Sequence, residues 1–575
     1  MLGKIIEASI RNRVLVLLAT VFLIGWGAYS LLRTPVDAIP DLSDVQVIIY
    51  TEYPGQSPRT VEDQVTYPLT TAMVSVPGSS VVRGYSFFGY SLVYIIFKDG
   101  TDLYWARSRV LEYLNYAQKR LPRDVVPTLG PDATGVGWVF EYTVTSPHRS
   151  LAELRSLQDW FLRYQLASVP GVAEVASIGG FVRQYQVTVD PAKLLAFHLP
   201  LTDVEMAIRR SNSDVGGEVL EMGEKEFMVR GLGYIRSVDD LKAIALGVDE
   251  RSGTPVYLHE VAEVALGPLM SRGLTEAIGE GEVVAGIVVM RYGQNALEVI
   301  RGVKQKLAEL RQGLPEDVKI TVAYDRSGLI ERAIQTLRSK LLEECLIVAL
   351  VSILFLLHVR SALVAIFTLP TAILMAFAVM HWQGISANIM SLGGIAIAIG
   401  AMVDAAIIMI ENAHKHLEHE ALKAEAERRP HWQVILEAAR EVGPSLFYSL
   451  LVITVSFVPV FTLQGQEGRL FRPLAFTKTY SMAAAAILSV TLVPVLMGYW
   501  VRGRILPEQK NPLNRLLIRA YHPVARFVLR YPKSVIVAAI LLVAVTVIPF
   551  LQLGSEFMPP LYEGDLLYMP TTLPG

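Results

Sequence analysis

The sequence contains almost no cysteine. Its single cysteine, Cys345, lies within an apolar run, so an intramolecular disulfide and a cysteine metal cluster are both excluded. Any transition-metal chemistry must therefore use methionine, histidine or carboxylate side chains.

The chain also has no excess of charge of either sign. It has 52 Lys and Arg against 54 Asp and Glu. It therefore lacks the excess of positive charge that is typical of nucleic-acid-binding proteins, and nucleic acid is not expected as a partner. It has no G-x-x-x-x-G-K-[ST] phosphate loop, which argues against ATP as a direct energy source. No nucleophile and base constellation stands out, so we expect neither an enzyme nor a tightly bound cofactor.

What the chain does have is long hydrophobic runs. Hydrophobic residues make up 52% of it, and they are concentrated in runs of about 20 residues, the length that spans a bilayer. We predict a polytopic α-helical membrane protein with spans at 14 to 32, 341 to 358, 362 to 380, 389 to 411, 445 to 463, 480 to 500 and 534 to 552. No small-residue cleavage site follows the first span, so it is expected to be an uncleaved anchor.

Lys and Arg residues in the short loops indicate the orientation. Basic residues precede the first span and follow the second, fourth and sixth spans, which places the N-terminus in the cytoplasm. The loop 464 to 479 disagrees, because Arg469, Arg472 and Lys478 fall on the opposite side. The stretch 511 to 529 alternates basic and apolar residues and is predicted to be an amphipathic helix on the membrane surface.

Residues 34 to 338 are then a periplasmic soluble region with a duplicated pattern. The first copy has a strand at 45 to 53, a helix at 59 to 75, a strand pair within 80 to 98 and a helix at 102 to 121. The second has a strand at 138 to 146, a helix at 151 to 168, a strand pair within 172 to 189 and a helix at 201 to 211. We predict an α+β region of two split βαβ subdomains, ferredoxin-like in type.

Two further features of this region support a duplication. Ser75-Val76-Pro77-Gly78 recurs as Ser168-Val169-Pro170-Gly171 at the same helix-to-strand corner, where Pro and Gly stop a helix. Residues 212 to 265 are predicted to be an inserted subdomain, after which strand 282 to 291, helix 295 to 313 and strand 318 to 324 resume the sandwich.

A larger repeat links the two ends of the chain. AIPDLSDVQVIIYTEYPG (38 to 55) follows the first span, and FMPPLYEGDLLYMPTTLPG (557 to 575) follows the seventh. Pro40 aligns with Pro559, and Tyr53-Pro54-Gly55 with Leu573-Pro574-Gly575. Since the second copy stops at its first strand, we expect a fragment or truncated form of a protein about twice as long.

Asp404 lies inside an otherwise uncharged apolar run, 389 to 410. A carboxylate at mid-bilayer depth costs about 2.5 to 3.5 kcal/mol, so such residues are by default functional candidates. Gly393 and Gly400 share its helix face, and this face is expected to pack against another helix. Its functional role would be proton binding, and the alternative is a structural Asp bonded to neighbouring Ser or Thr. No other predicted span has a Lys or Arg at mid-depth, so a cationic partner would have to come from elsewhere.

Methionines form the second candidate set. A thioether is a soft donor that suits Cu(I) and Ag(I), but methionine is also ordinary packing material, and for any single one the core role is favoured. Met402 and Met409 share a helix face about 200° from Asp404. The candidate metal ligands lie in the fourth span (Met390, Met402 and Met409), in the sixth span (Met482 and Met497) and outside the membrane (Met270 and Met569).

The order of one span, a large loop, six spans and a second loop resembles the resistance-nodulation-division superfamily of proton-coupled exporters. Within it, the chain is similar to the heavy-metal efflux branch, and to its copper and silver pumps in particular. The stretches that carry this resemblance are TPVDAIPDLSDVQVIIYTEYPGQSP (34 to 58), ARSRVLEYLN (106 to 115), LGPDATGVGWVFEY (129 to 142), ANIMSLGGIAIAIGAMVDAAIIMIENAHK (387 to 415) and GQEGRLFRPLAFTKTY (465 to 480).

The resemblance implies a homotrimer in the bacterial inner membrane that works with a periplasmic membrane fusion protein and an outer-membrane channel. It implies that Asp404 is a proton-relay carboxylate and that Met569 belongs to a periplasmic three-methionine metal site. It also implies that Met270, Met390, Met402, Met409, Met482 and Met497 relay metal toward that site. Zinc, cobalt and cadmium relatives carry an additional aspartate in the fourth span, whereas Ala396 to Ile399 are apolar here, which favours a monovalent metal.

The sequence therefore predicts proton-driven efflux of monovalent copper or silver. An exporter of other metals or organic compounds on the same fold, and a non-transporting membrane scaffold, remain alternatives. The expected domains are 1 to 33 (N-terminus and first span), 34 to 338 (periplasmic porter and docking region), 339 to 500 (spans two to six), 501 to 532 (cytoplasmic amphipathic helix), 533 to 552 (seventh span) and 553 to 575 (start of a second periplasmic region).

Overall fold

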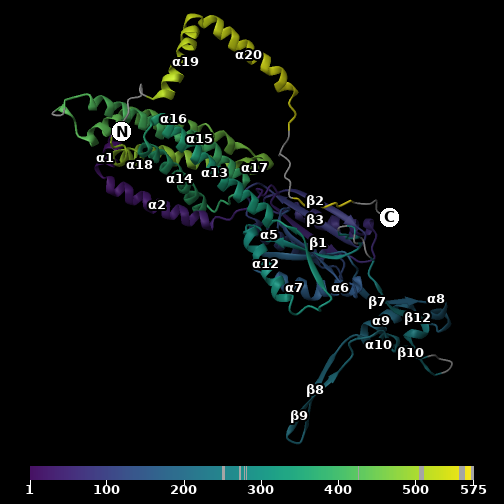
Figure 1. Cartoon of the computed structure of the whole chain (residues 1–575). Helices are drawn as coiled ribbons and strands as arrows, with labels where there is room; N and C mark the ends of the chain where they lie inside the picture. The colour runs from purple at the N-terminus through teal and green to yellow at the C-terminus, as the bar shows by residue number, and fades with distance from the viewer. Residues whose placement is uncertain are drawn as a thin grey trace. The chain divides into compact units, whose positions relative to one another are not determined.

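Figure 1 shows the computed structural model of the chain, which describes all residues except 249–252, 271, 272, 278, 280, 425, 426, 504–510, 556–563 and 571–575. The chain forms two compact units. Unit 1 contains Met1–Val139, Met290–Arg301 and Asp325–Gly575, and unit 2 contains Phe140–Val289 and Gly302–Tyr324. Unit 2 is therefore inserted into the sequence of unit 1.

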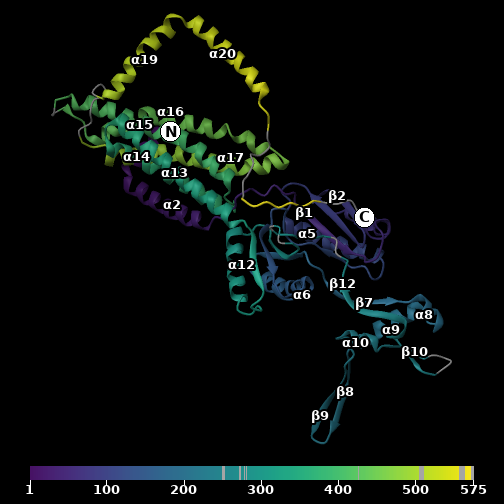
Figure 2. The ribbon, with the colours of Figure 1, turned by 45° about the vertical axis from the view of Figure 1, so that its right-hand side comes forward.

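Unit 1 holds the long apolar helices. Five helical segments of the described chain are long and apolar enough to span a membrane, and a bent helix pair would make a sixth. The five are α2 (Arg13–Arg33), α14 (Val359–Trp382), α15 (Ile389–Ala421), α16 (His431–Val455) with the 3-10 turn that ends at Thr462, and α20 (Pro532–Gln552). Helices α14 to α17 lie side by side in both Figure 1 and Figure 2.

The predicted second span, 341 to 358, lies in α13 (Ser327–Leu356). This helix is not among the five, because Lys340, Glu343 and Glu344 lie inside it. Its role as a span stays a prediction. Cys345 of α13 is half-buried and packs against the core of the helical bundle.

The bent pair corrects the predicted loop at 464 to 479. Residues Gly465–Val490 form one helix, α17, which meets α18 (Leu492–Trp500) at a bend of 51°. Lys478 therefore lies inside a helix and not in a loop, while the expectation that no other span has a Lys or Arg at mid-depth stays a prediction. Its side chain is 5% exposed, and its Nζ lies 2.9 Å from the ring centroid of Phe457.

Arg469, one of the three basic residues that disagreed with the orientation rule, lies at the start of α17. Its guanidinium donates to the Leu42 carbonyl and to Asp44, at 2.9 Å in each case, and also pairs with Asp99. The hydrogen bond from Arg469 holds the pKa of Asp99 below its usual range. The guanidinium of Arg469 thus contacts carboxylates of the soluble part of unit 1.

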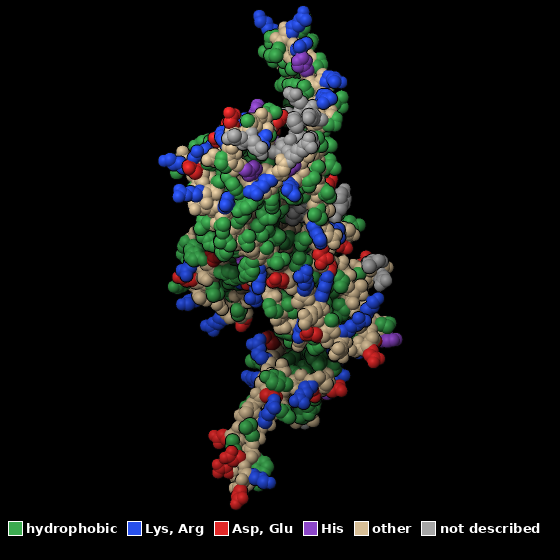
Figure 3. Space-filling model, turned by 60° about the vertical axis from the view of Figure 1, so that its left-hand side comes forward, with side chains coloured by type: hydrophobic (Ala, Val, Ile, Leu, Met, Phe, Trp, Pro, Cys, Tyr) green, Lys and Arg blue, Asp and Glu red, His purple; other side chains and the backbone are tan. Residues whose placement is uncertain are grey.

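The outer surfaces of these helices are apolar. Figure 3 shows hydrophobic side chains covering the helices on the visible face, with Lys and Arg gathered beyond them. On α2 the exposed residues include Leu15, Leu18 and Phe22, as expected for a surface that contacts lipid. Helices α1 (Leu2–Arg11) and α19 (Pro512–Arg530) precede α2 and α20, and α19 is the predicted amphipathic helix.

The soluble part of unit 1 is one antiparallel sheet with helices. Strands β1 (Gln46–Glu52), β2 (Ser79–Phe87), β3 (Tyr90–Phe97) and β4 (Pro127–Leu129) lie in the order β2-β3-β1-β4. The segment between β1 and β2 contains α3 (Pro58–Val61), a π-helical turn (Glu62–Thr66) and α4 (Tyr67–Met73), and α5 (Leu103–Ala117) connects β3 to β4. These elements confirm the strands and helices predicted for the first copy.

The second sheet contains β5 (Trp138–Thr145), β6 (Val172–Ile178), β13 (Val284–Met290) and β14 (Lys319–Asp325) in the order β14-β5-β13-β6. With β5 counted as the first strand, this is the same order as in the first sheet. Helix α6 (Leu151–Leu157), a π-helical turn (Gln158–Leu162) and α7 (Arg163–Ala167) follow β5, and α12 (Ala296–Leu310) precedes β14. A π-helical turn occupies the corresponding helix in both copies.

The predicted strand pair within 172 to 189 is wrong. Strand β6 pairs within the second sheet, whereas β7 (Arg183–Val189) pairs with β12 (Ala262–Pro268) in a separate sheet. The third strand of the second sheet is β13, which arrives about 100 residues later in the chain. The turn between β6 and β7 therefore leads out of the sheet instead of forming a hairpin.

The segment between β6 and β13 has its own core. Helices α8 (Pro191–Ala196) and α9 (Leu201–Ser211) share this core with residues of α10 (Val238–Lys242), β11 (Pro255–Tyr257), α11 (Leu258–Val261) and β12. Strand β10 (Ala245–Val248) pairs with β11, and the exposed hairpin of β8 (Val215–Met222) and β9 (Lys225–Gly231) extends the segment. This packed segment is larger than the predicted 212 to 265, because β7, α8 and α9 belong to it.

The larger repeat at 557 to 575 lies mostly outside the described residues. This includes Pro559 and the Leu573-Pro574-Gly575 match. Met569 is described and is 67% exposed.

Candidate functional site

Helix α15 carries the central candidate residues and begins at a strong cap. The Asn388 side chain accepts from the backbone N–H of Ser391, and the Ser391 hydroxyl accepts from the backbone N–H of Asn388. This reciprocal capping box satisfies two amides that the first turn would otherwise leave unpaired. The helix then runs for 33 residues and contacts α13, α14, α16 and α17.

The two faces of α15 differ as the sequence predicts. Met402 and Met409 are 5% and 0% exposed, whereas Asp404 is an exposed residue of the described chain. Ile397 and Ile408, on the same side as Asp404, are 52% and 43% exposed. The opposition of the methionine face and the carboxylate face is confirmed.

Close packing of α15 uses a different glycine from the two predicted. A Cβ built on Gly393 or Gly400 meets nothing within 4 Å, so no described residue packs closely at these two positions of the face they share with Asp404. A Cβ on Gly394 would instead collide with the Thr477 hydroxyl and lie 2.5 Å from the Leu474 carbonyl oxygen. It is Gly394 that lets α15 approach α17.

The face of α15 that carries Gly393, Gly400 and Asp404, called the open face below, borders a cavity shared with α13. A cavity of about 410 Å³ lies there, lined by Leu329, Arg332, Ala333, Thr336 and Lys340 of α13 and by Ile389, Leu392, Gly393 and Ala396 of α15. Arg332 and Lys340 are the basic residues of this lining, and Lys340 pairs with Glu343 of the same helix at 2.7 Å.

Four of the candidate methionines meet in one hydrophobic core. Met402 and Met409 of α15, Met482 of α17 and Met497 of α18 belong to the same cluster, and the last three are completely buried. Full burial is what core packing requires, and it also places soft sulfur donors where no water competes for a metal ion. Met380 of α14 is buried in the same cluster and was not among the sequence candidates.

The other three candidates lie apart. Met390 is half-buried in the first turn of α15, and Met569 is exposed in unit 1. Met270 belongs to unit 2, is 71% exposed and lines a cavity of about 480 Å³ together with Phe181 and Glu282. Within the described residues no group of three or more His, Cys, Asp or Glu could hold a metal ion.

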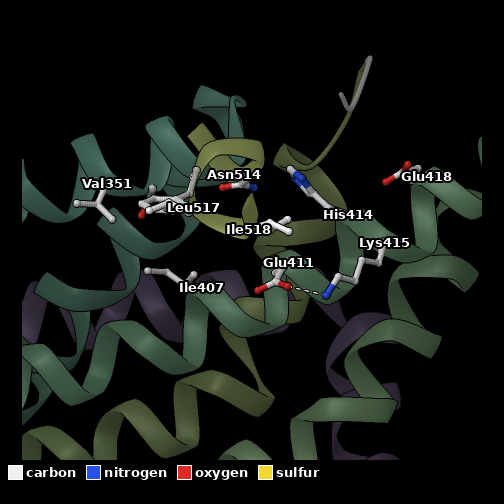
Figure 4. Close-up of a pocket in the computed structure, with 11 residues that line it drawn as sticks. Val351, Ile407, Glu411, His414, Lys415, Glu418, Asn514, Leu517 and Ile518 are labelled. Carbon is white, nitrogen blue, oxygen red and sulfur yellow. Dashed lines mark hydrogen bonds and ion pairs between the residues drawn. The ribbon is translucent and has the colours of Figure 1, made fainter. Parts of the chain in front are cut away.

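A second cavity, of about 400 Å³, lies at the other end of the open face (Figure 4). Its wall is formed by Ile407, Glu411, His414, Lys415 and Glu418 of α15 together with residues of α13 and α19. Glu411 pairs with Lys415 at 2.6 Å. Sequence analysis missed His414, because it lies beyond the predicted span.

Comparison with known proteins assigns the chain to a family. Residues 5–575 match the AcrB/AcrD/AcrF family, and the chain belongs to this family, which is of the resistance-nodulation-division type. Its arrangement of apolar helices and sheet-containing domains is that of these pumps.

The individual relatives that the chain matches are metal cation efflux and resistance proteins. The chain is 58% identical over 580 residues to the cation efflux system protein CusA of Escherichia coli strain K12, covering 100% of this chain and 55% of CusA. It is 36% identical over 586 residues to the cobalt-zinc-cadmium resistance protein CzcA of Cupriavidus metallidurans, covering 100% of this chain and 55% of CzcA. The crystal structure of a heavy metal efflux pump aligns with a TM-score of 0.80 at 30% identity, covering 96% of this chain and 53% of that one. The chain thus spans about half the length of the relatives it matches.

Proposed function

We propose that this chain is part of the pump subunit of a proton-driven system that exports monovalent copper and silver. The observation that carries the proposal is the division of α15 into two faces. Met402 and Met409 are buried in the hydrophobic core that also contains Met482 and Met497, while Asp404 stands on an open face of the same helix. One rigid helix therefore presents soft metal donors on one side and a titratable group on the other.

The similarity to CusA supports a cation as the substrate. Thioether donors suit Cu(I) and Ag(I) better than harder divalent ions. Ala398 and Ile399, in the stretch where divalent-metal relatives carry an additional aspartate, are buried in the hydrophobic core. A carboxylate there would be buried in this apolar cluster, which favours a monovalent metal.

Proton binding at Asp404 would drive the conformational cycle. The open face with Gly393 and Gly400 receives further helices of the assembled pump, and these bring a cation near Asp404. Protonation of the carboxylate removes its attraction to that cation, so the helices shift. The shift moves the methionine face because both faces belong to one helix, and it opens and closes the periplasmic cleft as a rigid-body motion. The protein is thus a secondary active antiporter and not an enzyme.

The assembly follows from the family. We propose a homotrimer in the bacterial inner membrane, with a periplasmic membrane fusion protein and an outer-membrane channel as partners. The two sheets of identical strand order are assigned to split βαβ subdomains of the periplasmic region. Met569 and Met270 are assigned to the periplasmic metal site and to the route toward it.

The test is Asp404→Asn in the assembled pump, reconstituted in liposomes with a pH-sensitive dye inside. Ag⁺-dependent proton flux should fall at least tenfold while the oligomeric state and Ag⁺ binding stay unchanged. Asp404→Glu keeps a titratable carboxylate and should retain part of the flux. Proton flux at the wild-type level in Asp404→Asn would remove Asp404 from the coupling mechanism.

A further inference from the structure

A chain of three hydrogen-bonded side chains connects α14 and α15 at the end of the bundle that holds the 400 Å³ cavity. The His414 Nε2 and the Ser361 Oγ lie 2.7 Å apart, and the same Ser361 Oγ lies 2.7 Å from the Nδ1 of His358. Ser361 is fully buried and His414 is 8% exposed. The two imidazole rings are 5.6 Å apart, so the serine hydroxyl bridges them.

The partners of His358 determine which nitrogen carries hydrogen. Its Nε2 lies 3.2 Å from the Arg502 carbonyl, which can only accept, so Nε2 is the protonated nitrogen. Its Nδ1 accepts from the backbone N–H of Ser361 at 3.2 Å, as the N-cap of α14. Both contacts therefore require the same neutral tautomer.

The direction of the other two bonds follows from this tautomer. Because the Nδ1 of His358 is an acceptor, the single hydroxyl hydrogen of Ser361 points to it. The hydroxyl oxygen can then only accept from His414, so the Nε2 of His414 carries hydrogen and its Nδ1 is unprotonated. Every one of these hydrogen bonds points from His414 toward His358, which is the arrangement that transfer of a proton in this direction needs.

The cavity lies between these hydrogen-bonded side chains and the face of α15 that carries Asp404. Ile407, Glu411 and His414 lie within about 80° of Asp404 around the helix, and Glu411 is about 10 Å from it along the axis. The hydroxyl of Ser352, which also lines the cavity, is buried and has no protein partner in the described part of the chain. A cavity of about 400 Å³ that is lined in part by Ser352, Glu411 and Lys415 has room for several waters beside these polar groups. Charged and titratable groups around it are Glu411, Lys415 and Glu418 of α15, with His358, Arg360 and Arg502 beyond the hydroxyl bridge.

We propose that this cavity and the chain from His414 through Ser361 to His358 form the path by which protons leave the Asp404 helix for the cytoplasm. A proton from cavity water binds the Nδ1 of His414, whose Nε2 proton passes to the Ser361 oxygen. The hydroxyl proton of Ser361 passes to the Nδ1 of His358, and the Nε2 proton of His358 passes to water beside the Arg502 carbonyl. One proton enters and one leaves, and both imidazoles end as Nδ1–H tautomers, which must return to the Nε2–H form before the next transfer.

Two amide substitutions keep the hydrogen bonds and remove the proton transfer. His414→Gln retains a donor toward Ser361, and His358→Asn retains an acceptor that caps α14. His416→Gln is the matched control. His416 lies half a turn further along α15 and pairs with Glu441, so it takes no part in the hydrogen bonds from His414 to His358. In the assembled pump in liposomes, Ag⁺-dependent proton flux should fall at least tenfold in the first two variants and stay at the wild-type level in the control. Ag⁺ binding should be unchanged in all three.

Chemical rescue separates proton transfer from a structural role. In His414→Ala the space left by the imidazole ring opens onto the cavity. Free imidazole added to the buffer should restore proton flux in proportion to the concentration of neutral imidazole. Wild-type flux in His414→Gln and His358→Asn, or a loss in His414→Ala that imidazole does not restore, would overturn the proposal. The inference depends on the proposed proton coupling, and the two are distinguishable. If Asp404→Asn abolishes flux while the histidine variants retain it, only the exit path is wrong.

Discussion

Replacing Gly394 by alanine tests how α15 and α17 are held together. The new Cβ would lie 2.5 Å from the Leu474 carbonyl oxygen and would also collide with the Thr477 hydroxyl. The carbonyl belongs to the helix backbone and cannot rotate away, so the helices must separate by about 1 Å to reach ordinary contact, an overpacking that costs about 1 to 3 kcal/mol. Alanine gains about 1 kcal/mol of helix propensity over glycine, which offsets part of this cost.

Gly393→Ala is the matched control for this change. It is the adjacent glycine of the same helix, and a Cβ there meets nothing within 4 Å. The propensity gain is shared by both variants, so the difference between them isolates the packing cost, and Gly394→Ala should be less stable than Gly393→Ala by about 1 to 3 kcal/mol.

Cys345 provides the assay for this pair. It is the only cysteine and is half-buried against the bundle core, so the onset of its reaction with a thiol-specific dye on heating reports unfolding of the bundle. Gly394→Ala should react at a lower temperature than Gly393→Ala. Equal unfolding temperatures would show that the two helices do not meet at Gly394.

Two further predictions concern charge and sulfur. Hydrogen bonds from Arg149 and Ser146 lower the pKa of Asp317 to about 2, so its stabilising contribution is present above pH 4 and is lost as the pH falls toward 2. Asp317→Asn should flatten the acid dependence of the unfolding temperature in that range, and an unchanged slope would contradict this. Met482→Leu and Met497→Leu conserve volume in the core and should cost less than about 1.5 kcal/mol, yet they should lower Ag⁺ transport. Met380→Leu, in the same cluster, should not, and equal effects in all three would assign the methionines to packing.

Local sequence patterns were sufficient to predict the helices and strands, but not to predict which strands pair in the sheets. Alternating hydrophobicity and the helix cap signals located β1 to β3 and α5 within a few residues, and the Ser-Val-Pro-Gly corners marked corresponding turns in both copies. The third strand of the second sheet is β13, which is separated from β6 by a whole packed segment. A strand pair close in sequence is the simplest prediction, and nothing local to 172 to 189 shows that the two strands part.

At the candidate site, periodicity located the faces of α15 but not what covers them. The opposition of Met402 and Asp404 follows from helical geometry alone. Gly393 and Gly394 differ by one position in sequence, and only the packing of α17 shows which of them is in contact. Lys478 was assigned to a loop because its charge ended the apolar run, whereas the helix continues through it and the cation lies against the ring of Phe457. The spacing of His358 and Ser361, three apart at the start of a span, was the available signal for a capped and hydrogen-bonded end.

The open carboxylate face of α15 has a consequence for biogenesis. A helix that enters the bilayer with Asp404 facing lipid carries a free-energy penalty of about 2.5 to 3.5 kcal/mol, and burying the carboxylate against another helix removes that penalty. Association of the remaining helices is therefore favoured by the residue that later carries the proton. The same side chain would act first as an assembly signal and afterwards as part of the transport mechanism, so a substitution that makes it neutral should make the unassembled helix more stable in the membrane.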